Sequence, residues 1–191
     1  MNIASDKKEI IPEDFRPKQT PHSLRVIMGK ANSQDINRSN VVIKELGEVK
    51  LIGFRVLCGN KDYQEEIHKA ACILQERVKE IKHVMNSGRQ VGAYIVEDTV
   101  PEKDGYWVCV QVSSFQQVPE DMVTLTVPPQ KYVTMMHKGP NTLIGKSYEV
   151  IHNWMVIKDL KRASYSWKLE LYQANEINPT DLHVELYDSI Y

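Results

Sequence analysis

Two acidic residues, each placed two positions before a tyrosine, carry the most suggestive chemistry of the sequence. Glu170 precedes Tyr172 and Glu185 precedes Tyr187, both within short runs that alternate apolar and polar side chains. In a β-strand, residues two apart project from the same face, so each carboxylate is expected beside its tyrosine. A carboxylate removed from water attracts cations, and a ring face nearby adds roughly 0.5–2 kcal/mol of cation–π energy. The pattern is typical of a cation-binding surface, although a solvated sheet face gives the same alternation.

The two runs are expected to pair with each other in a hairpin. Residues 166–173 and 182–190 are both predicted strands, and a turn at Asn178-Pro179 separates them. We predict that their polar faces combine into one patch, with both carboxylates and both tyrosines on the floor of a ligand cleft. Other aromatic side chains that could line the cleft are Tyr132, Tyr148, Trp154, Trp107 and Phe54. The two tryptophans are explained at least as well as core residues.

The remaining patterns predict the elements that would hold this patch in place. A strand, a helix and two strands follow one another in the first half of the chain, and the second half repeats that order. The predicted strands are 49–57, 91–97, 106–113, 122–136, 166–173 and 182–190, and the helices are 63–85 and 142–157. Two such units can join edge to edge. This predicts an α+β fold of duplicated β-α-β-β units in one antiparallel sheet, with both helices on one face and a ligand cleft between the halves.

Composition narrows the range of functions. The chain has 191 residues, 42% of them hydrophobic, and its 24 basic and 25 acidic side chains give a net charge of −1. This balance provides no general attraction to nucleic acid or to an anionic membrane. No apolar run is long enough to cross a bilayer, and Cys58, Cys72 and Cys109 are too widely spaced to suggest a disulfide framework. We therefore expect a cytoplasmic protein with free thiols and no membrane contact.

The chain divides into two unequal parts. Residues 1–40 form a polar extension that contains prolines and is expected to be partly flexible, because it has too little apolar surface to offset its ordering entropy. Residues 41–191 form the folded domain, with halves at about 41–114 and 121–191. The extension is too short and too poorly patterned for a helix-turn-helix, so direct binding to nucleic acid is not expected.

Residue spacing argues against two other kinds of site. The run from Gly139 to Ser147 resembles a phosphate-binding loop, but five residues separate its glycines where the motif has four, and Gly145-Lys146-Ser147 falls within a predicted helix. None of the six histidines has the spacing of a metal site. No metal and no cofactor is predicted.

From about Val41 onward, the sequence resembles the GyrI-like, AraC-type effector-binding family, which is related to the SOUL fold. The matching stretches are Leu51-Ile-Gly-Phe-Arg-Val, Val127-Pro-Pro-Gln-Lys-Tyr132, His137-Lys-Gly-Pro140, Tyr148-Glu-Val-Ile-His-Asn-Trp154, Leu169-Glu-Leu-Tyr172 and Val184-Glu-Leu-Tyr187. The resemblance implies a ligand cleft between the halves and bulky aromatic ligands, cationic ones included. It also implies that Glu170 is the counter-charge.

Three functions follow, and the first is favoured. The chain would be a stand-alone binder of aromatic small molecules that sequesters or senses them. Alternatively, as the resemblance also implies, it would be a hydrolase that opens the cyclopropane of alkylating natural products. Glu185 or Glu170 would then act as general base, and Tyr132 would donate a proton to the developing oxyanion. The third function is a protein-interaction module of the gyrase-inhibitor type, whose partner the sequence does not identify.

Overall fold

The computed structural model describes residues 41–57, 63–96, 101–173 and 178–191, all within one compact unit, Asp35–Tyr191. The predicted extension at residues 1–40 and Cys58 lie outside the described residues. In the described part of the chain, no helix is both long and apolar enough to span a membrane.

Ten principal elements form the described fold, and all those that the sequence predicts have a counterpart among them in the predicted order. Those of the first half are β1 (Val42–Leu46), β2 (Val49–Val56), α1 (Tyr63–Arg77), β3 (Gln90–Tyr94) and β4 (Tyr106–Val112). Those of the second half are β5 (Val123–Val127), β6 (Gln130–Gly139), α2 (Ile144–Ile157), β7 (Lys168–Tyr172) and β8 (Leu182–Ile190). Short 3-10 turns follow α1 at η3 (Val78–Glu80), precede β3 at η4 (Asn86–Gly88) and precede α2 at η5 (Asn141–Leu143).

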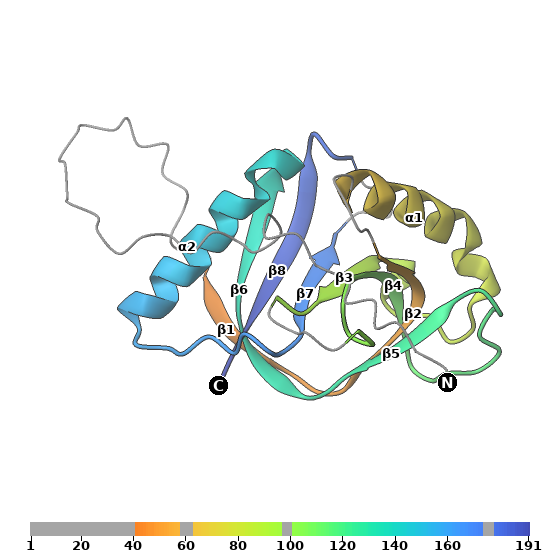
Figure 1. The fold of residues 1–191 in the computed structure, drawn as a ribbon, viewed down its shortest axis with the longest axis horizontal. Coiled ribbons are helices and arrows are strands. Elements are labelled where there is room, and N and C mark those ends of the chain that lie inside the picture. The colour runs from red at the N-terminus through yellow and green to blue at the C-terminus, as the bar shows by residue number, and fades with distance from the viewer. Residues whose placement is uncertain (1–40, 58–62, 97–100, 174–177) are drawn as a thin grey trace, which may run out of the picture. The chain divides into compact units, whose positions relative to one another are not determined.

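The strands form a single antiparallel sheet in the order β1-β6-β8-β7-β3-β4-β2-β5 (Figure 1). Strands β3 and β7 are hydrogen-bonded neighbours, and their pairing is the seam at which the two halves join. The predicted α+β fold, with duplicated β-α-β-β units in one sheet, is confirmed.

The outer strands are exchanged between the halves. Strand β1 precedes β2 in sequence but pairs with β6 of the second half. Strand β5 precedes β6 but pairs with β2 of the first half. Each half of the sheet is therefore completed at its edge by a strand that is adjacent in sequence to the other half.

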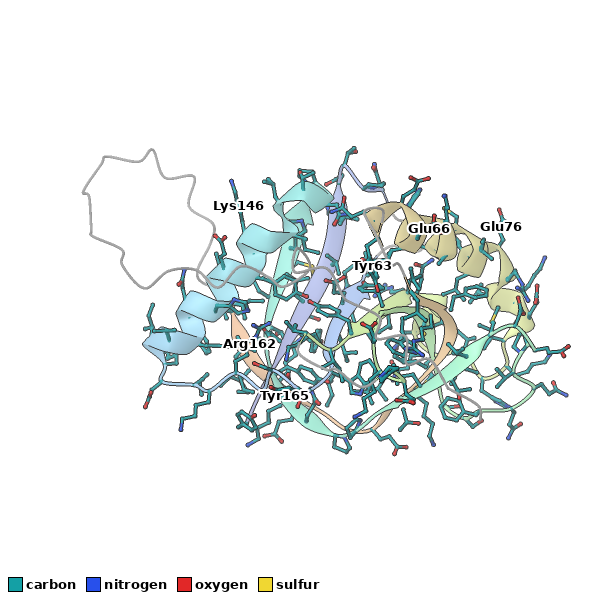
Figure 2. The ribbon with its side chains drawn as sticks, viewed as in Figure 1. Tyr63, Glu66, Glu76, Lys146, Arg162 and Tyr165 are labelled. Carbon is teal, nitrogen blue, oxygen red and sulfur yellow. The ribbon has the colours of Figure 1, made fainter. Side chains whose placement is uncertain are left out.

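Both helices cover the same face of the sheet, as predicted (Figure 1). The register aligns Leu186, Glu170, Gly92, Val108 and Phe54 across five neighbouring strands, so their side chains share this face. One apolar core lies beneath α2 and a second lies beneath α1. A third core, which contains Trp107, Tyr132, Trp167 and Tyr187, fills the opposite face. Figure 2 shows Glu66 and Glu76 of α1 and Lys146 of α2 on the sides that point away from the sheet.

Two predicted elements differ from the structure. The single strand predicted at 122–136 is two strands, because Pro128 and Pro129 lack the N–H groups that a continuous ladder requires. The helix predicted at 63–85 ends as an α-helix at Arg77. Ile81 leaves the helical conformation and is buried in the core beneath α1. The apolar spacing that predicted a longer helix therefore continues past the real helix end.

Candidate ligand-binding site

The register of β7 and β8 separates the two carboxylates that the sequence places in one patch. Glu185 lies opposite Leu171, and Glu170 lies opposite Leu186. Because side chains alternate along a strand, Glu170 projects toward the helices and Glu185 projects from the other face. The prediction of a continuous patch is wrong: a register different by one residue from the expected one moves one acid to the far side of the sheet.

Glu170 is held by three tyrosine hydroxyls that come from three different elements. Tyr106 of β4 donates to Oε2 at 2.5 Å, and Tyr148 of α2 donates to Oε1 at 3.0 Å. Tyr172, two residues along β7, donates to Oε2 at 3.4 Å. Tyr94 completes this group of rings, because it stacks on Tyr106 with 5.7 Å between ring centroids and 19° between ring planes. We call Glu170 and these four residues the tyrosine cage.

Gly92 makes room for the cage. It lies directly across from Glu170 on β3, and the hydroxyl of Tyr106 passes over it. A Cβ atom at position 92 would be 1.8 Å from that hydroxyl oxygen. Glycine at this position is therefore what allows the Tyr106 ring to reach the carboxylate.

The charge of Glu170 has no cationic partner among the described side chains. It is buried, with 7% of its surface exposed, and among the described residues its side-chain hydrogen bonds come from phenols rather than from any lysine, arginine or histidine. Burial raises the pKa of Glu170 above its ordinary value, and the hydrogen bonds from Tyr106, Tyr148 and Tyr172 only partly oppose this. The site thus contains a carboxylate whose ionised form would be stabilised by a bound cation.

The four phenols keep their protons at neutral pH. Burial, followed by the negative charge of Glu170, raises the pKa of Tyr94, Tyr106, Tyr148 and Tyr172. Each hydroxyl is therefore a hydrogen-bond donor, and each ring is a neutral aromatic surface. The cage combines one buried acid with four ring faces, which is the chemistry that aromatic cations require.

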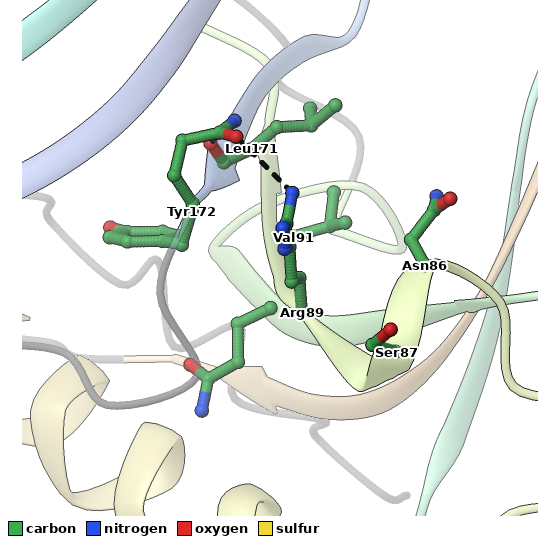
Figure 3. A pocket seen from close by; sticks show the side chains of 8 residues that line it. Asn86, Ser87, Arg89, Val91, Leu171 and Tyr172 are labelled. Atoms are coloured by element: carbon green, nitrogen blue, oxygen red, sulfur yellow. Dashed lines mark hydrogen bonds between the residues drawn. The ribbon is translucent and has the colours of Figure 1, made fainter.

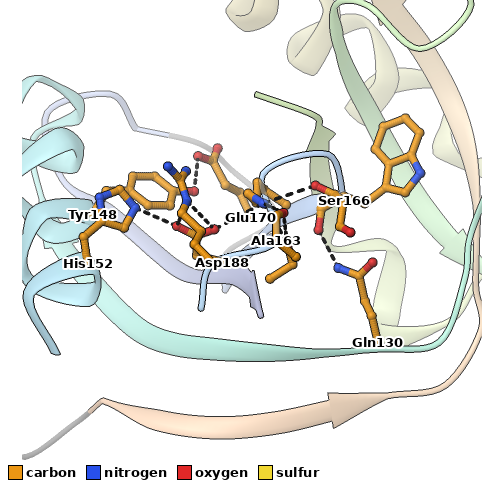
Figure 4. A network of polar contacts seen from close by, with 11 residues as sticks. Gln130, Tyr148, His152, Ala163, Ser166, Glu170 and Asp188 are labelled. Atoms are coloured by element: carbon orange, nitrogen blue, oxygen red, sulfur yellow. Dashed lines mark hydrogen bonds and ion pairs between the residues drawn. The ribbon is translucent and has the colours of Figure 1, made fainter. Parts of the chain in front are cut away.

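A second buried carboxylate on the same face provides a contrast (Figure 4). Asp188 of β8 is fully buried, and its charge is balanced by Arg162 Nε at 2.9 Å and Lys168 Nζ at 3.4 Å. His152 Nε2 lies 2.7 Å from the same carboxylate, within hydrogen-bond distance. Burial acts to raise the pKa of Asp188, but the hydrogen bond from His152 and the charges of Arg162 and Lys168 outweigh it and the pKa is lowered. The protein neutralises Asp188 internally, whereas Glu170 has no such partner.

Four other predicted site residues lie on the face away from the helices. Glu185 pairs with Lys44 Nζ at 2.5 Å and accepts a hydrogen bond from Tyr187 at 2.8 Å. Tyr132 packs edge-on against Tyr187 with ring centroids 5.4 Å apart, and Trp107 is in the same core. The prediction that these residues share one surface with Glu170 is wrong, because the sheet lies between them.

The last two predicted residues lie on the helix-bearing side without taking part in the cage. Trp154 is partly buried against the core beneath α2, and the Lys158 ammonium lies 5.8 Å from the centroid of its ring. Phe54 packs against the core beneath α1, with Arg77 at a similar distance from its ring. Sequence reasoning missed Tyr94, Tyr106 and Gly92, although a glycine inside an apolar strand marks a close approach of other groups.

A pocket of about 360 Å³ opens at one end of the seam between the halves (Figure 3). Its walls come from η4, from the first residues of β3 and from the end of β7, and they include Tyr172 of the cage. Arg89 in this wall donates to the side-chain oxygen of Gln173 at 3.3 Å. Buried Gln90 ties the wall to α1 through a hydrogen bond to the carbonyl of Ala71. The pocket and the cage thus share a side chain.

Duplicated halves that share one antiparallel sheet, with one helix on each side of the seam, are the fold of the GyrI-like effector-binding domains. The model of the integron-associated effector binding protein family, Cass2, matches residues 42–190. The chain belongs to this family. Among curated proteins, no match was found.

Solved structures show the same fold at low sequence identity. EcmrR in a complex with DNA has a TM-score of 0.60 and 18% identity; the match covers 78% of this chain and 56% of EcmrR. This chain therefore spans little more than half the length of EcmrR. SAV2435 bound to tetraphenylphosphonium has a TM-score of 0.59 and 17% identity, over 79% of this chain and 93% of that one. The integron cassette protein VCH_CASS2 of Vibrio cholerae has a TM-score of 0.51 and 16% identity, over 80% and 97%.

Proposed function

We propose that the chain binds aromatic small molecules that carry a positive charge, and that Glu170 is the counter-charge. The observation that supports this most strongly is the buried carboxylate of Glu170, which is surrounded by tyrosines and has no cationic partner among the described residues. A delocalised cation costs less to remove from water than a compact ammonium ion, and the rings then contact its surface. Binding would serve sequestration or sensing of the ligand.

The tyrosine hydroxyls suit a site that must exist both with and without its ligand. In the free protein they satisfy the carboxylate oxygens by hydrogen bonding, so that the buried acid is not left bare. When a cation binds, it supplies the opposite charge and the rings supply contact area. SAV2435, which has the same fold, was solved with tetraphenylphosphonium bound, and this supports the choice of an aromatic cation as ligand.

Isothermal titration with tetraphenylphosphonium tests the proposal. We expect Glu170→Gln to weaken binding by about tenfold or more, because the variant keeps the shape of the side chain and loses its charge. Glu185→Gln is the matched control, since it removes an equal charge from the opposite face of the sheet. Equal affinities of the wild type and Glu170→Gln would refute the role of the carboxylate.

A hydrolase remains the second candidate because of the raised pKa of Glu170. The ionised carboxylate of Glu170 can accept a proton from water as the water oxygen attacks a ring carbon of an electrophilic cyclopropane. The C–C bond of the ring then breaks, its electron pair passes to a conjugated carbonyl oxygen of the substrate, and a neighbouring phenol donates to that developing oxyanion. Tyr106 or Tyr148 is placed for that donation, whereas Tyr132 is on the other face. Glu185 does not suit the role of general base, because it lies on the other face of the sheet and forms an ion pair with Lys44. Chromatography of a cyclopropane-bearing alkylator after incubation would reveal ring-opened product; unchanged compound would argue against catalysis.

A further inference from the structure

The pocket at the end of the seam differs in chemistry from the tyrosine cage beside it. Of the eight described residues that line it, Arg89 is the only charged one. Its guanidinium contacts the neutral amide of Gln173, and it has no carboxylate partner among the described residues. An exposed guanidinium that faces a pocket and has no acid beside it is suited to a carboxylate or another anionic oxygen group.

The pocket also has the polar surroundings that would orient such a group. Asn86, Ser87 and Gln173 contribute polar side chains to its wall, and Val91 and Leu171 contribute apolar surface (Figure 3). Gln90 fixes the wall against α1, as its side chain is buried and bonded to Ala71. The opening is therefore built on the strands of the seam rather than on loops alone.

The pocket and the tyrosine cage adjoin each other at Tyr172. Tyr172 lines the pocket and donates to Glu170, which lies two residues away on β7. Two residues of a strand extend roughly 7 Å. One ligand can thus place a cationic aromatic group in the cage and an anionic group beside Arg89.

We propose that the preferred ligands are bipolar: an aromatic cation held by Glu170 carries a short arm that ends in a carboxylate or similar anion, and Arg89 binds that anion. This rests on the proposed function of the tyrosine cage and adds the second half of its ligand. A purely cationic compound would fill the cage alone and leave the pocket to water.

Two synthetic probes separate the contributions. Triphenylphosphonium with a carboxybutyl arm is bipolar, and its methyl ester has the same shape without the negative charge. By titration calorimetry, we expect the wild type to bind the acid about three- to fivefold more tightly than the ester, the range of an exposed charge pair. The preference should shrink as salt is raised.

Two variants test whether Arg89 is the source of the preference for the acid over the ester. Arg89→Gln should bind acid and ester equally and keep the wild-type affinity for the ester. Lys146→Gln, which removes the same charge from the outer side of α2, should keep the preference (Figure 2). Equal binding of the two probes by the wild type, or a preference that persists in Arg89→Gln, overturns the bipolar ligand. Ester binding unaffected by Glu170→Gln overturns the role of the cage instead, and failure of both probes to bind overturns both.

Discussion

The hydroxyl oxygen of Tyr106 occupies the space in which any residue other than glycine at position 92 would place its Cβ atom. A methyl group there would lie 1.8 Å from the hydroxyl oxygen, so the ring must move away from Glu170. We expect Gly92→Ala to cost about 1–3 kcal/mol of the free energy of unfolding, through the lost hydrogen bond to the carboxylate. Denaturant unfolding measures this loss. A variant as stable as the wild type would show that the ring does not depend on Gly92.

Gly53 provides a comparison for that variant. A Cβ at position 53 would lie 2.1 Å from the backbone oxygen of Val108, and a strand cannot move aside as a tyrosine ring can. Gly53→Ala should therefore reduce stability more than Gly92→Ala, without acting on the cage. Equal losses in the free energy of unfolding would contradict this explanation, which requires a displaced backbone to cost more than a displaced tyrosine ring.

Removing the charge of Glu170 should not destabilise the free protein at neutral pH. The ionised carboxylate is buried without a cation among the described residues, so Glu170→Gln relieves an electrostatic cost while it keeps most hydrogen bonds. We expect its free energy of unfolding to equal or exceed that of the wild type, although its affinity for tetraphenylphosphonium falls. Chemical denaturation without ligand makes the measurement, and a large loss of stability would contradict it.

Asp188→Asn should have the opposite effect on stability. This substitution leaves Lys168 and Arg162 without the buried negative charge that they share. Breaking a buried ion pair by removing one partner costs about 3–5 kcal/mol, and we expect a loss in this range. The same denaturation experiment compares the two variants. Similar stabilities for Glu170→Gln and Asp188→Asn would contradict the contrast between an acid with cationic partners and an acid without them.

The raised pKa of Glu170 predicts how the stability of the free protein and its affinity for ligand depend on pH. Because the pKa of Glu170 in the folded state is above its ordinary value of 4.5, the folded protein holds this proton more tightly than the unfolded chain. The stabilisation from this group is complete below pH 4.5 and is lost as the pH rises through the folded-state pKa. Affinity for tetraphenylphosphonium should increase over the same interval. Chemical denaturation and calorimetric titration at several pH values check the two trends, each taken as the difference between the wild type and Glu170→Gln.

Tyr132 is predicted to contribute neither to binding nor, through its hydroxyl, to stability. The hydroxyl is buried and has no hydrogen-bond partner in the described part of the chain, so Tyr132→Phe removes an unsatisfied polar group. Unfolding should require the same free energy or up to about 1 kcal/mol more. Calorimetric titration should give an unchanged affinity for tetraphenylphosphonium. A tenfold weaker affinity of Tyr132→Phe would show that Tyr132 takes part in binding, in spite of its position on the other face of the sheet.

The fold could be predicted from the sequence because its signals are local. Alternation of apolar and polar residues marked Leu182–Ile190 with the bounds that the structure has, and helical spacing marked α2 to within its first turn. The single strand predicted at 122–136 was wrong although its prolines were visible, because apolar residues continue on both sides of Pro128-Pro129. The proline pair ends the strand in spite of this apolar continuity, because neither proline has an N–H group to donate to the sheet.

The candidate site could be predicted only in part, because it depends on register. Alternation correctly placed Glu170 with Tyr172 and Glu185 with Tyr187, since each pair lies within one strand. Which face of one strand adjoins which face of the next depends on the pairing across the hairpin, and no residue pattern specified that pairing. Tyr106 reaches Glu170 across β3, over a glycine, so its contribution became visible only once three strands were assembled.

The exchange of β1 and β5 between the halves restricts the motions by which a ligand could enter and leave the proposed site. Hydrogen bonding is continuous from one edge of the sheet to the other, and each outer strand is tied by a short connection to the opposite half. A clamshell opening along the seam would break the β3–β7 ladder and strain both connections. We therefore expect the proposed ligand to enter and leave by displacement of the helices and tyrosine rings, while the sheet stays intact.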